Sequence, residues 1–247
     1  MYDLKGKNAV VTGGNSGMGY HIAQQLKEAG TNVIIVGRSE EKVSQSAKEL
    51  NVTGKVADVS QSQQIELLAQ EINNEINGVD ILVVNAGTFL LQPIGQLTTE
   101  VFDATINVNL RGAVFTIEKF ASILNSGASV VVMSSVSAHV ARDNTAIYGA
   151  SKAALNAYAK SAANVLSERN IRVNIVSPGP TDTPIFSKMG LPESHSNAVK
   201  ENIKQLVPLG RLAEPNEIAE LVLYLSSPKA TYITGSEFVI DGGALVR

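Results

Sequence analysis

The sequence predicts an α/β fold: a single-domain, Rossmann-type, doubly wound parallel sheet of about seven strands with helices on both faces. Short apolar runs alternate with longer segments of helical period, which is typical of this class. Several runs lack the polar alternation of a half-exposed strand, as expected when helices cover both faces. No linker, repeat or composition break divides residues 1–247, and 44% of the 247 residues are hydrophobic, enough for a sizeable core.

The expected strands are short, rich in Val and Ile, and mostly bounded by Gly, Asn, Asp or Ser. In order they are Asn8–Thr12, Asn32–Val36, Lys55–Ala57, Asp80–Val84, Ser129–Ser134, Arg172–Val176 and Glu237–Ile240. The expected helices between them are Gly17–Ala29, Ser39–Leu50, Gln61–Ile76, Thr99–Leu124, Ile147–Arg169 and Asn216–Leu225, with a further one within Ser196–Gln205. Residues 184–212 contain three prolines and two glycines, so we expect an excursion that covers the substrate.

Composition excludes several classes of function. The net charge of −3 gives no basic excess for nucleic acid or anionic lipid, and the absence of cysteine excludes disulfides and thiolate chemistry. We find no membrane-spanning run, and the first residues, MYDLKGKNAVVTGG, do not resemble a targeting segment. Three scattered histidines, at 21, 139 and 195, have no ligand spacing, so no metal site is predicted. We expect a cytoplasmic protein with no nucleic-acid or membrane partner.

A glycine-rich turn, TGGNSGMG, joins the first strand to the first helix. Its glycines allow a tight turn and close approach of a ligand, and the free N–H groups of the new helix favour a pyrophosphate. A simple strand-to-helix connection is the alternative. The predicted contacts are Gly13, Asn15, Ser16, Gly17, Met18 and Gly19.

A tyrosine and a lysine stand four residues apart in the segment IYGASKAAL, so Tyr148 and Lys152 share one helix face. A cation early in a helix opposes the macrodipole, which suggests a role other than helix stability. A buried tyrosine beside a snorkelling lysine is the alternative for the isolated pair.

Together these motifs, in this order, resemble the short-chain dehydrogenase/reductase family in its compact single-domain branch, over essentially the whole chain. The resemblance includes the spacing TGxxxGxG and the YxxxK pair, and implies two sets of site residues. The catalytic set is Asn109, Ser135, Tyr148 and Lys152. The remaining cofactor contacts are Asp58 and Val59 for the adenine, Asn85, Ala86 and Gly87 flanking the cofactor, Tyr148 and Lys152, and Pro178, Gly179, Thr181 and Thr183 toward the nicotinamide.

The predicted chemistry is carbonyl reduction or its reverse. A phenol of pKa near 10 is a poor acid at neutral pH, and we expect the ammonium of Lys152 to lower the pKa of Tyr148. Ser135 would orient the substrate oxygen. The resemblance implies that Asn109 bends its helix and holds a proton-relaying water.

The sequence departs from the family pattern at three places: Val84 before the asparagine, residues 136–139 after Ser135, and Thr181 in place of an apolar residue. The second departure concerns the substrate pocket, which we predict from Ser137, His139, Phe186 and Met189. A solvent-exposed loop position is the alternative for His139.

The second strand ends in Gly37, where NAD-preferring dehydrogenases generally have an acid that binds the ribose 2′-hydroxyl. Arg38 and Ser39 follow and suit a 2′-phosphate. We therefore expect NADP(H), with NAD(H) the less favoured cofactor.

The sequence leaves three alternatives open. The substrate, a small carbonyl compound or alcohol, could instead be a 3-oxoacyl group on a carrier protein, with Arg111, Lys188, Lys200 and Lys204 as basic contacts. A catalytically idle dinucleotide-binding regulator is the second alternative, and a methyltransferase, which would normally have an acid after the second strand, is the third. Extra apolar positions on two of the expected helices predict a second buried face, and the family resemblance implies that this face pairs subunits into a homotetramer: Val101, Phe102, Val114, Phe115, Ala153, Ala157 and Ala162.

Overall fold

The computed structural model describes residues 2–140, 143–184 and 200–246. Within these residues one parallel sheet has the strand order β3-β2-β1-β4-β5-β6-β7, confirming the predicted Rossmann-type architecture. The strands are β1 (Asn8–Thr12), β2 (Asn32–Gly37), β3 (Thr53–Val56), β4 (Val79–Val84), β5 (Leu124–Met133), β6 (Arg172–Pro178) and β7 (Glu237–Ile240). The order reverses between β1 and β4, which is where such sheets open a ligand crevice at their carboxyl edge.

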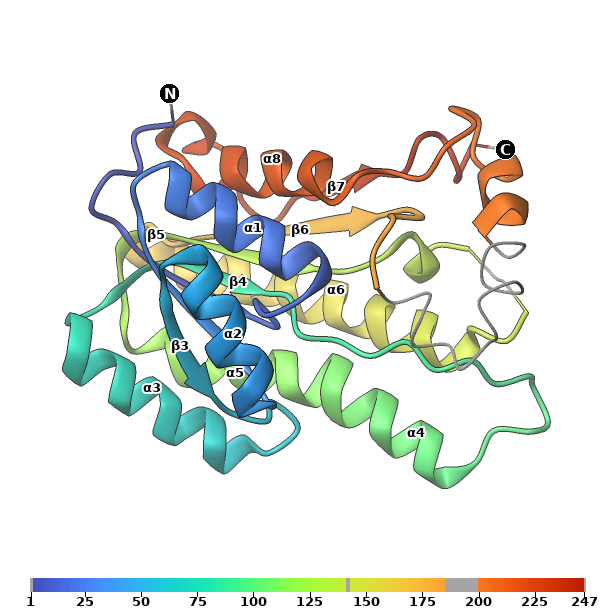
Figure 1. Cartoon of the computed structure of the whole chain (residues 1–247), viewed down its shortest axis with the longest axis horizontal. Coiled ribbons are helices and arrows are strands. Elements are labelled where there is room, and N and C mark those ends of the chain that lie inside the picture. The colour runs from blue at the N-terminus through green and yellow to red at the C-terminus, as the bar shows by residue number, and fades with distance from the viewer. Residues whose placement is uncertain (1, 141–142, 185–199, 247) are drawn as a thin grey trace.

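Helices cover both faces of the sheet (Figure 1). They are α1 (Gly17–Glu28), α2 (Glu40–Leu50), α3 (Ser62–Ile76), α4 (Thr99–Ile106), α5 (Ala113–Ala121), α6 (Ala146–Leu166) and α8 (Pro215–Ser226). Short 3-10 turns span Val136–Ala138, Ser167–Arg169 and Pro228–Ala230. One apolar core packs α3, α5 and α6 on the sheet, and the other packs α1, α2 and α8 on the opposite face.

The long helix expected over Thr99–Leu124 is not continuous. A π-helical turn, Asn107–Gly112, separates α4 from α5, which ends at Ala121 so that Leu124 can begin β5. The cause of the widened turn is tertiary: the Asn109 side chain is held by the backbone of Thr88, and Gly112 lies so close to Val59 that an added Cβ would be 2.7 Å from its carbonyl oxygen. π-Turns are frequent at functional sites.

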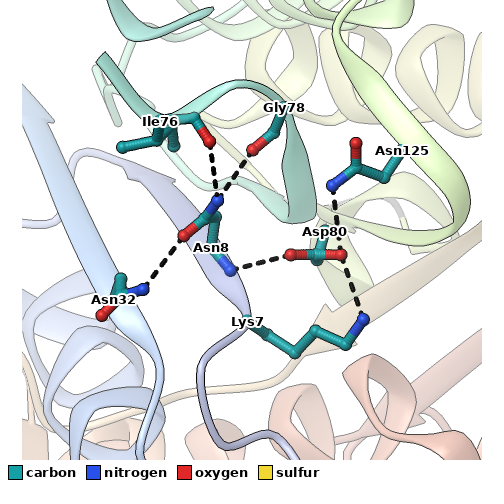
Figure 2. Close-up of polar contacts among 7 residues, drawn as sticks. All are labelled: Lys7, Asn8, Asn32, Ile76, Gly78, Asp80 and Asn125. Atoms are coloured by element: carbon teal, nitrogen blue, oxygen red, sulfur yellow. Dashed lines mark hydrogen bonds and ion pairs between the residues drawn. The ribbon is translucent and has the colours of Figure 1, made fainter.

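The amino edge of the sheet is held by a cluster of polar side chains at the starts of four neighbouring strands (Figure 2). Asp80 accepts hydrogen bonds from the Asn8 backbone N–H at 2.9 Å and from Lys7 and Asn125 at 3.2 Å each. The Asn8 side chain donates to the carbonyls of Ile76 and Gly78 and accepts from Asn32. We call Lys7, Asn8, Asn32, Asp80 and Asn125 the Asp80 cluster.

The base of the excursion predicted over residues 184–212 is fixed to the sheet. Ala213 donates to the Pro180 carbonyl and accepts from the Asp182 N–H, both at 2.9 Å. Residues 200–205 are helical. The greater part of the segment, with Phe186, Lys188, Met189 and Leu191, lies outside the described residues.

Candidate active site

Three of the four predicted catalytic residues meet at the carboxyl edge of the sheet. Ser135 follows β5 and begins the 3-10 turn, where its Oγ accepts the N–H of Ser137 at 3.1 Å. Tyr148 lies in the first turn of α6 and shares a hydrogen bond with the Ser135 side chain. Lys152 lies one helical turn further on, with its Nζ 5.9 Å from the centre of the Tyr148 ring.

Lys152 is a buried amine with little compensation. Its side chain lies among residues of β5 and α6, and its Nζ donates to the Met133 carbonyl at 2.8 Å. It enters no ion pair among the described residues. Burial lowers the pKa of Lys152 to about 8. An ammonium held this way has hydrogen bonds left to donate to a ligand.

The pKa of Tyr148 differs from the sequence prediction. Burial raises it above its ordinary value, and the hydrogen bond with Ser135 lowers it by less than burial raises it. The predicted lowering by Lys152 is therefore wrong for this structure, because the effect of desolvation is larger than the effect of the neighbouring groups. A phenol with a raised pKa is protonated at neutral pH, and so it can donate a proton.

Phe89 is a site residue that the sequence reasoning missed. It follows β4 and stacks edge-on against Tyr148, with ring centres 4.8 Å apart and planes at 85°. The sequence predicts that the nearby Asn85-Ala86-Gly87 segment flanks the cofactor, but no pattern in the sequence indicates where the side chains after this segment point. Phe89 gives the Tyr148 ring an apolar wall.

Asn109, the fourth predicted catalytic residue, is buried in the π-turn and clamps the loop after β4. Its Oδ1 accepts the Thr88 N–H at 2.7 Å, and its Nδ2 donates to the Thr88 carbonyl at 2.9 Å. A Cβ placed on Gly87 would lie 3.3 Å from Asn109 Oδ1 and 3.8 Å from Lys152 Nζ. Asn109 and Lys152 thus flank the same open position.

The glycine-rich turn is built as a close-approach site. Gly13 and Gly17 have φ of +66° and +55°, which other residues rarely adopt. A Cβ on Gly19 would lie 2.3 Å from the Gly13 carbonyl oxygen. At the start of α1, Ser16 makes no capping side-chain bond and the first turn holds no acid, which leaves its N–H groups for an anion. Asn15, Ser16 and Met18 are all part-exposed in this turn.

Asn85 ties the segment after β4 to the glycine-rich turn. Its Nδ2 donates to the carbonyls of Thr12 and Gly13 at 2.9 and 3.3 Å. The Thr12 hydroxyl accepts the N–H groups of Asn85 and Ala86 at 3.0 and 3.1 Å. These bonds fix the two chain segments that the sequence assigned to the cofactor against each other.

The predicted ribose and adenine contacts lie at the ends of β2 and β3. Arg38 is exposed and makes no ion pair with a described residue. Ser39 caps α2. The side chain of Asn15 lies on Gly37, where a Cβ would be 2.4 Å from its Oδ1, so Asn15 occupies the space an acid at position 37 would need. Asp58 is half-buried and accepts the Ser60 N–H at 2.9 Å, and Val59 follows it.

The predicted nicotinamide contacts come from the end of β6. Pro178 is buried, and Gly179 packs so tightly that a Cβ would lie 2.6 Å from the Asp241 Cα. The Thr181 hydroxyl donates to the Gly179 carbonyl at 3.0 Å. Thr183 reaches the glycine-rich turn, 3.6 Å from a Cβ placed on Gly17. The residues predicted to contact the adenine end and the nicotinamide end of the cofactor therefore lie along the same edge of the sheet.

The two described members of the predicted substrate pocket lie on the turn after Ser135. Ser137 is half-buried, and the exposed His139 ring contacts Glu237 of β7. His139 and Glu237, with Val239 and Leu245, line a cavity of about 370 Å³, and Ser137 is not among the lining residues. A substrate role for His139 and Ser137 stays a prediction.

No group of His, Cys, Asp or Glu among the described residues could hold a metal ion. None of the described helices is both long enough and apolar enough to span a membrane.

The sequence and fold have clear relatives. A family model described as enoyl-(acyl carrier protein) reductase matches residues 13–244. A tropinone reductase homolog of Arabidopsis thaliana is 36% identical over 255 residues, covering 100% of this chain and 93% of the relative. Oxidoreductase asL5 of Sarocladium schorii is 32% identical, covering 97% of this chain and 96% of the relative.

A solved structure has the same fold. A short-chain dehydrogenase/reductase from Serratia marcescens superposes with a TM-score of 0.89 at 31% identity, and 98% of each chain is covered. The fold is therefore shared over nearly the whole of both chains.

Proposed function

Because the chain belongs to the short-chain dehydrogenase/reductase family, we propose that it is an NADP(H)-dependent oxidoreductase that interconverts a ketone or aldehyde and an alcohol. The observation that carries the proposal is the contact of Ser135 with Tyr148 beside a buried Lys152 that makes no ion pair with a described residue. An idle binding protein has no need for this arrangement, because a buried amine with a single backbone acceptor is costly to folding.

Each residue has a distinct task in this proposal. The nicotinamide, when bound, supplies or accepts the hydride. Ser135 donates a hydrogen bond to the substrate oxygen and stabilises negative charge on it. Tyr148 is the general acid toward the alkoxide and the general base in the reverse direction. Lys152 supplies positive charge that favours the phenolate after proton transfer, and it also binds the ribose.

The cofactor preference rests on the end of β2. Gly37 has no room for an acid while Asn15 lies on it, and the exposed guanidinium of Arg38, which makes no ion pair with a described residue, suits a 2′-phosphate. The Ser39 hydroxyl can donate to the same phosphate. NADP(H) is therefore the proposed cofactor, with NAD(H) used less well.

The proposed substrate is a small carbonyl compound rather than a carrier-bound acyl group. Of the basic residues suggested for a carrier protein, Lys200 pairs with Asp182 and Lys204 with Glu201. Arg111 lies over the Phe115 ring. These contacts leave the described cations less available to a carrier protein.

We assign the protein to the cytoplasm as a homotetramer. Phe102 and Val165 are exposed on α4 and α6, with Ala153 and Ala157 exposed beside them, which suits a second apolar face. A monomeric mass by light scattering would contradict the assembly.

The test of the function is loss of NADPH absorbance with cyclohexanone, tropinone, diacetyl and acetoacetyl thioester, repeated with NADH. We expect turnover of at least one ketone, faster with NADPH. Binding of NADPH without turnover of any compound would instead favour the idle regulator. Turnover of the thioester alone would favour the acyl reductase.

A further inference from the structure

Glu237 is an acid at the start of an otherwise apolar strand, and its side chain is 12% exposed. One carboxylate oxygen, Oε1, lies 2.5 Å from His139 Nε2, 2.6 Å from Ser177 Oγ and 2.9 Å from Asn156 Nδ2. Burial by itself would raise the pKa of Glu237, but the hydrogen bonds from Ser177 and His139 and the charge interactions with His139 and Lys160 together outweigh burial and hold the pKa below its ordinary value. These four residues, the Glu237 cluster, therefore centre on an ionised carboxylate.

One of these contacts reaches the turn that carries Ser135. The His139 backbone N–H donates to the Val136 carbonyl at 2.9 Å, so His139 closes that turn. Its side chain then anchors the turn to β7 through Glu237. The middle of the turn packs closely on α6, where the Ser137 carbonyl oxygen would lie 2.5 Å from a Cβ on Gly149.

Another contact reaches the helix that carries Tyr148 and Lys152. Asn156 lies one turn beyond Lys152, so the three side chains follow one another at four-residue spacing along one face of α6. Asn156 is buried and donates to Glu237. Lys160, one turn further, adds a favourable charge interaction with the same carboxylate.

We propose that Glu237 is a positioning residue. It contacts the turn that carries Ser135 through His139, and it contacts α6 through Asn156, so that it holds the turn in a fixed position against α6. The inference rests on the proposed function, in which Ser135 and Tyr148 must hold one substrate oxygen between them. Reaction rates are sensitive to displacements of such groups by about 1 Å. A carboxylate bonded to both elements limits that displacement.

The test compares two carboxylates that are buried to a similar extent and have three hydrogen-bond partners each. Glu237→Gln keeps the side-chain size but removes the charged acceptor, and we expect kcat for cyclohexanone with NADPH to fall about tenfold. KM for NADPH should change much less than kcat, because most of the predicted cofactor contacts, from the glycine-rich turn to Gly87, lie on elements that Glu237 does not contact. Asp80→Asn is the control: its carboxylate is 16% exposed and also has three donors, but it lies at the amino edge, and kcat should not change.

The route through His139 is tested separately. His139→Leu should cause a similar loss of kcat, and His139→Gln should restore part of it because an amide can still donate to the carboxylate. In the double variant His139→Leu with Glu237→Gln, kcat should be little lower than in His139→Leu alone. If the two losses of kcat multiply, Glu237 does not act through His139. If Glu237→Gln does not fold, the comparison of His139→Leu with His139→Gln tests the proposal.

Fluorine NMR of protein labelled with meta-fluorotyrosine gives a readout that needs no substrate. The Tyr148 resonance, assigned with Tyr148→Phe, should move in Glu237→Gln and His139→Leu but stay in place in Asp80→Asn. An unmoved resonance together with unchanged kcat would overturn the proposal. If the wild type does not reduce cyclohexanone but the resonance moves, the substrate assignment fails while the positioning role stands.

Discussion

The two edges of the sheet use similar polar groups with different results. At the amino edge, the Asp80 carboxylate has three donors, and its neighbours bond to strand ends (Figure 2). At the carboxyl edge, Lys152 is buried with one backbone acceptor, and the Ser134 hydroxyl has no partner among the described residues. The amino edge is electrostatically complete, whereas the carboxyl edge leaves donors and acceptors unused.

This difference separates residues that stabilise the fold from residues that are held for a ligand. Unsatisfied buried groups cost stability, and they are retained where a site needs them. Substitutions at the amino edge should therefore change stability alone. Substitutions at the carboxyl edge should change activity, and at Lys152 they should even increase stability.

The largest effect is expected at Tyr148. Tyr148→Phe keeps the ring that packs on Phe89 but removes the hydroxyl, so turnover should fall about 10²- to 10⁴-fold, the usual contribution of general acid–base catalysis. NADPH binding, measured by calorimetry, and the melting temperature should not change. Tyr158→Phe is the control. Tyr158 also lies on α6, but its hydroxyl bonds to Glu118 of α5 at an exposed position. Near-normal turnover in Tyr148→Phe would contradict the assigned role.

A smaller effect, on stability, is expected at the amino edge. Asp80→Asn removes the charge that Lys7, Asn125 and the Asn8 N–H share, and the free energy of unfolding should fall by about 2 kcal/mol. Glu71→Gln, a change in an exposed ion pair, should alter it by less than about 0.5 kcal/mol. Urea unfolding measures both variants. A loss of turnover in folded Asp80→Asn would erase the distinction between the two edges.

The third prediction is a gain in stability at the carboxyl edge. In the folded protein the pKa of Lys152 is about 8, below its ordinary 10.5, so charging the amine opposes folding. Lys152→Met should raise the free energy of unfolding without cofactor by about 1–2 kcal/mol at pH 7, because the freed Met133 carbonyl offsets part of the gain.

The stability gain of Lys152→Met should depend on pH, because the pKa of Lys152 is lower in the folded than in the unfolded protein. Below pH 8 the amine is charged in both states and the full cost is present; as pH rises from 8 to 10.5 the folded state loses its proton first and the cost disappears. The stability advantage of Lys152→Met should therefore shrink over this interval, while turnover is lost throughout. Lower stability of the variant at pH 7 would show that the buried ammonium is compensated.

Sequence patterns predicted the features that depend on local chain segments. The seven strands follow from short apolar runs, and the glycine-rich turn follows from residues that adjoin one another between β1 and α1. The π-turn could not be predicted from a local pattern, because it involves the hydrogen bond between Asn109 and the backbone of Thr88, which is distant in the sequence. Strand β5 begins at Leu124 and not at the expected Ser129, and the apolar pattern did not indicate this earlier start because residues 125–128 are polar or small.

Within the candidate site, spacing placed Tyr148 and Lys152 on one face but could not give their burial. Charge proximity alone predicted a lowered Tyr148 pKa, whereas desolvation decides its direction in the structure. Glu237 was overlooked because an acid at the start of an edge strand is ordinarily a solvated residue. Its role emerges when β6, α6 and the turn after Ser135 are seen to converge on it.

The smallest effect is expected at the ribose end of the carboxyl edge, where the unused group is exposed rather than buried. Arg38 has no partner among the described residues, so a 2′-phosphate would gain a charge-assisted bond without breaking an existing ion pair. Solvent screening limits that bond, and Arg38→Ala should reduce the NADPH-over-NADH ratio of kcat/KM about tenfold.

The loss should fall on NADPH, since NADH has no phosphate for Arg38 to bind. Lys48→Ala, which removes a cation from the far end of α2, is the matched control and should leave the ratio unchanged. Melting temperature should change little in either variant, because both side chains are exposed and neither makes an ion pair with a described residue. A wild type that favours NADH, or a ratio unmoved by Arg38→Ala, would mean that Gly37 and Arg38 do not select the phosphate, even though Asn15 occupies the space of the competing acid.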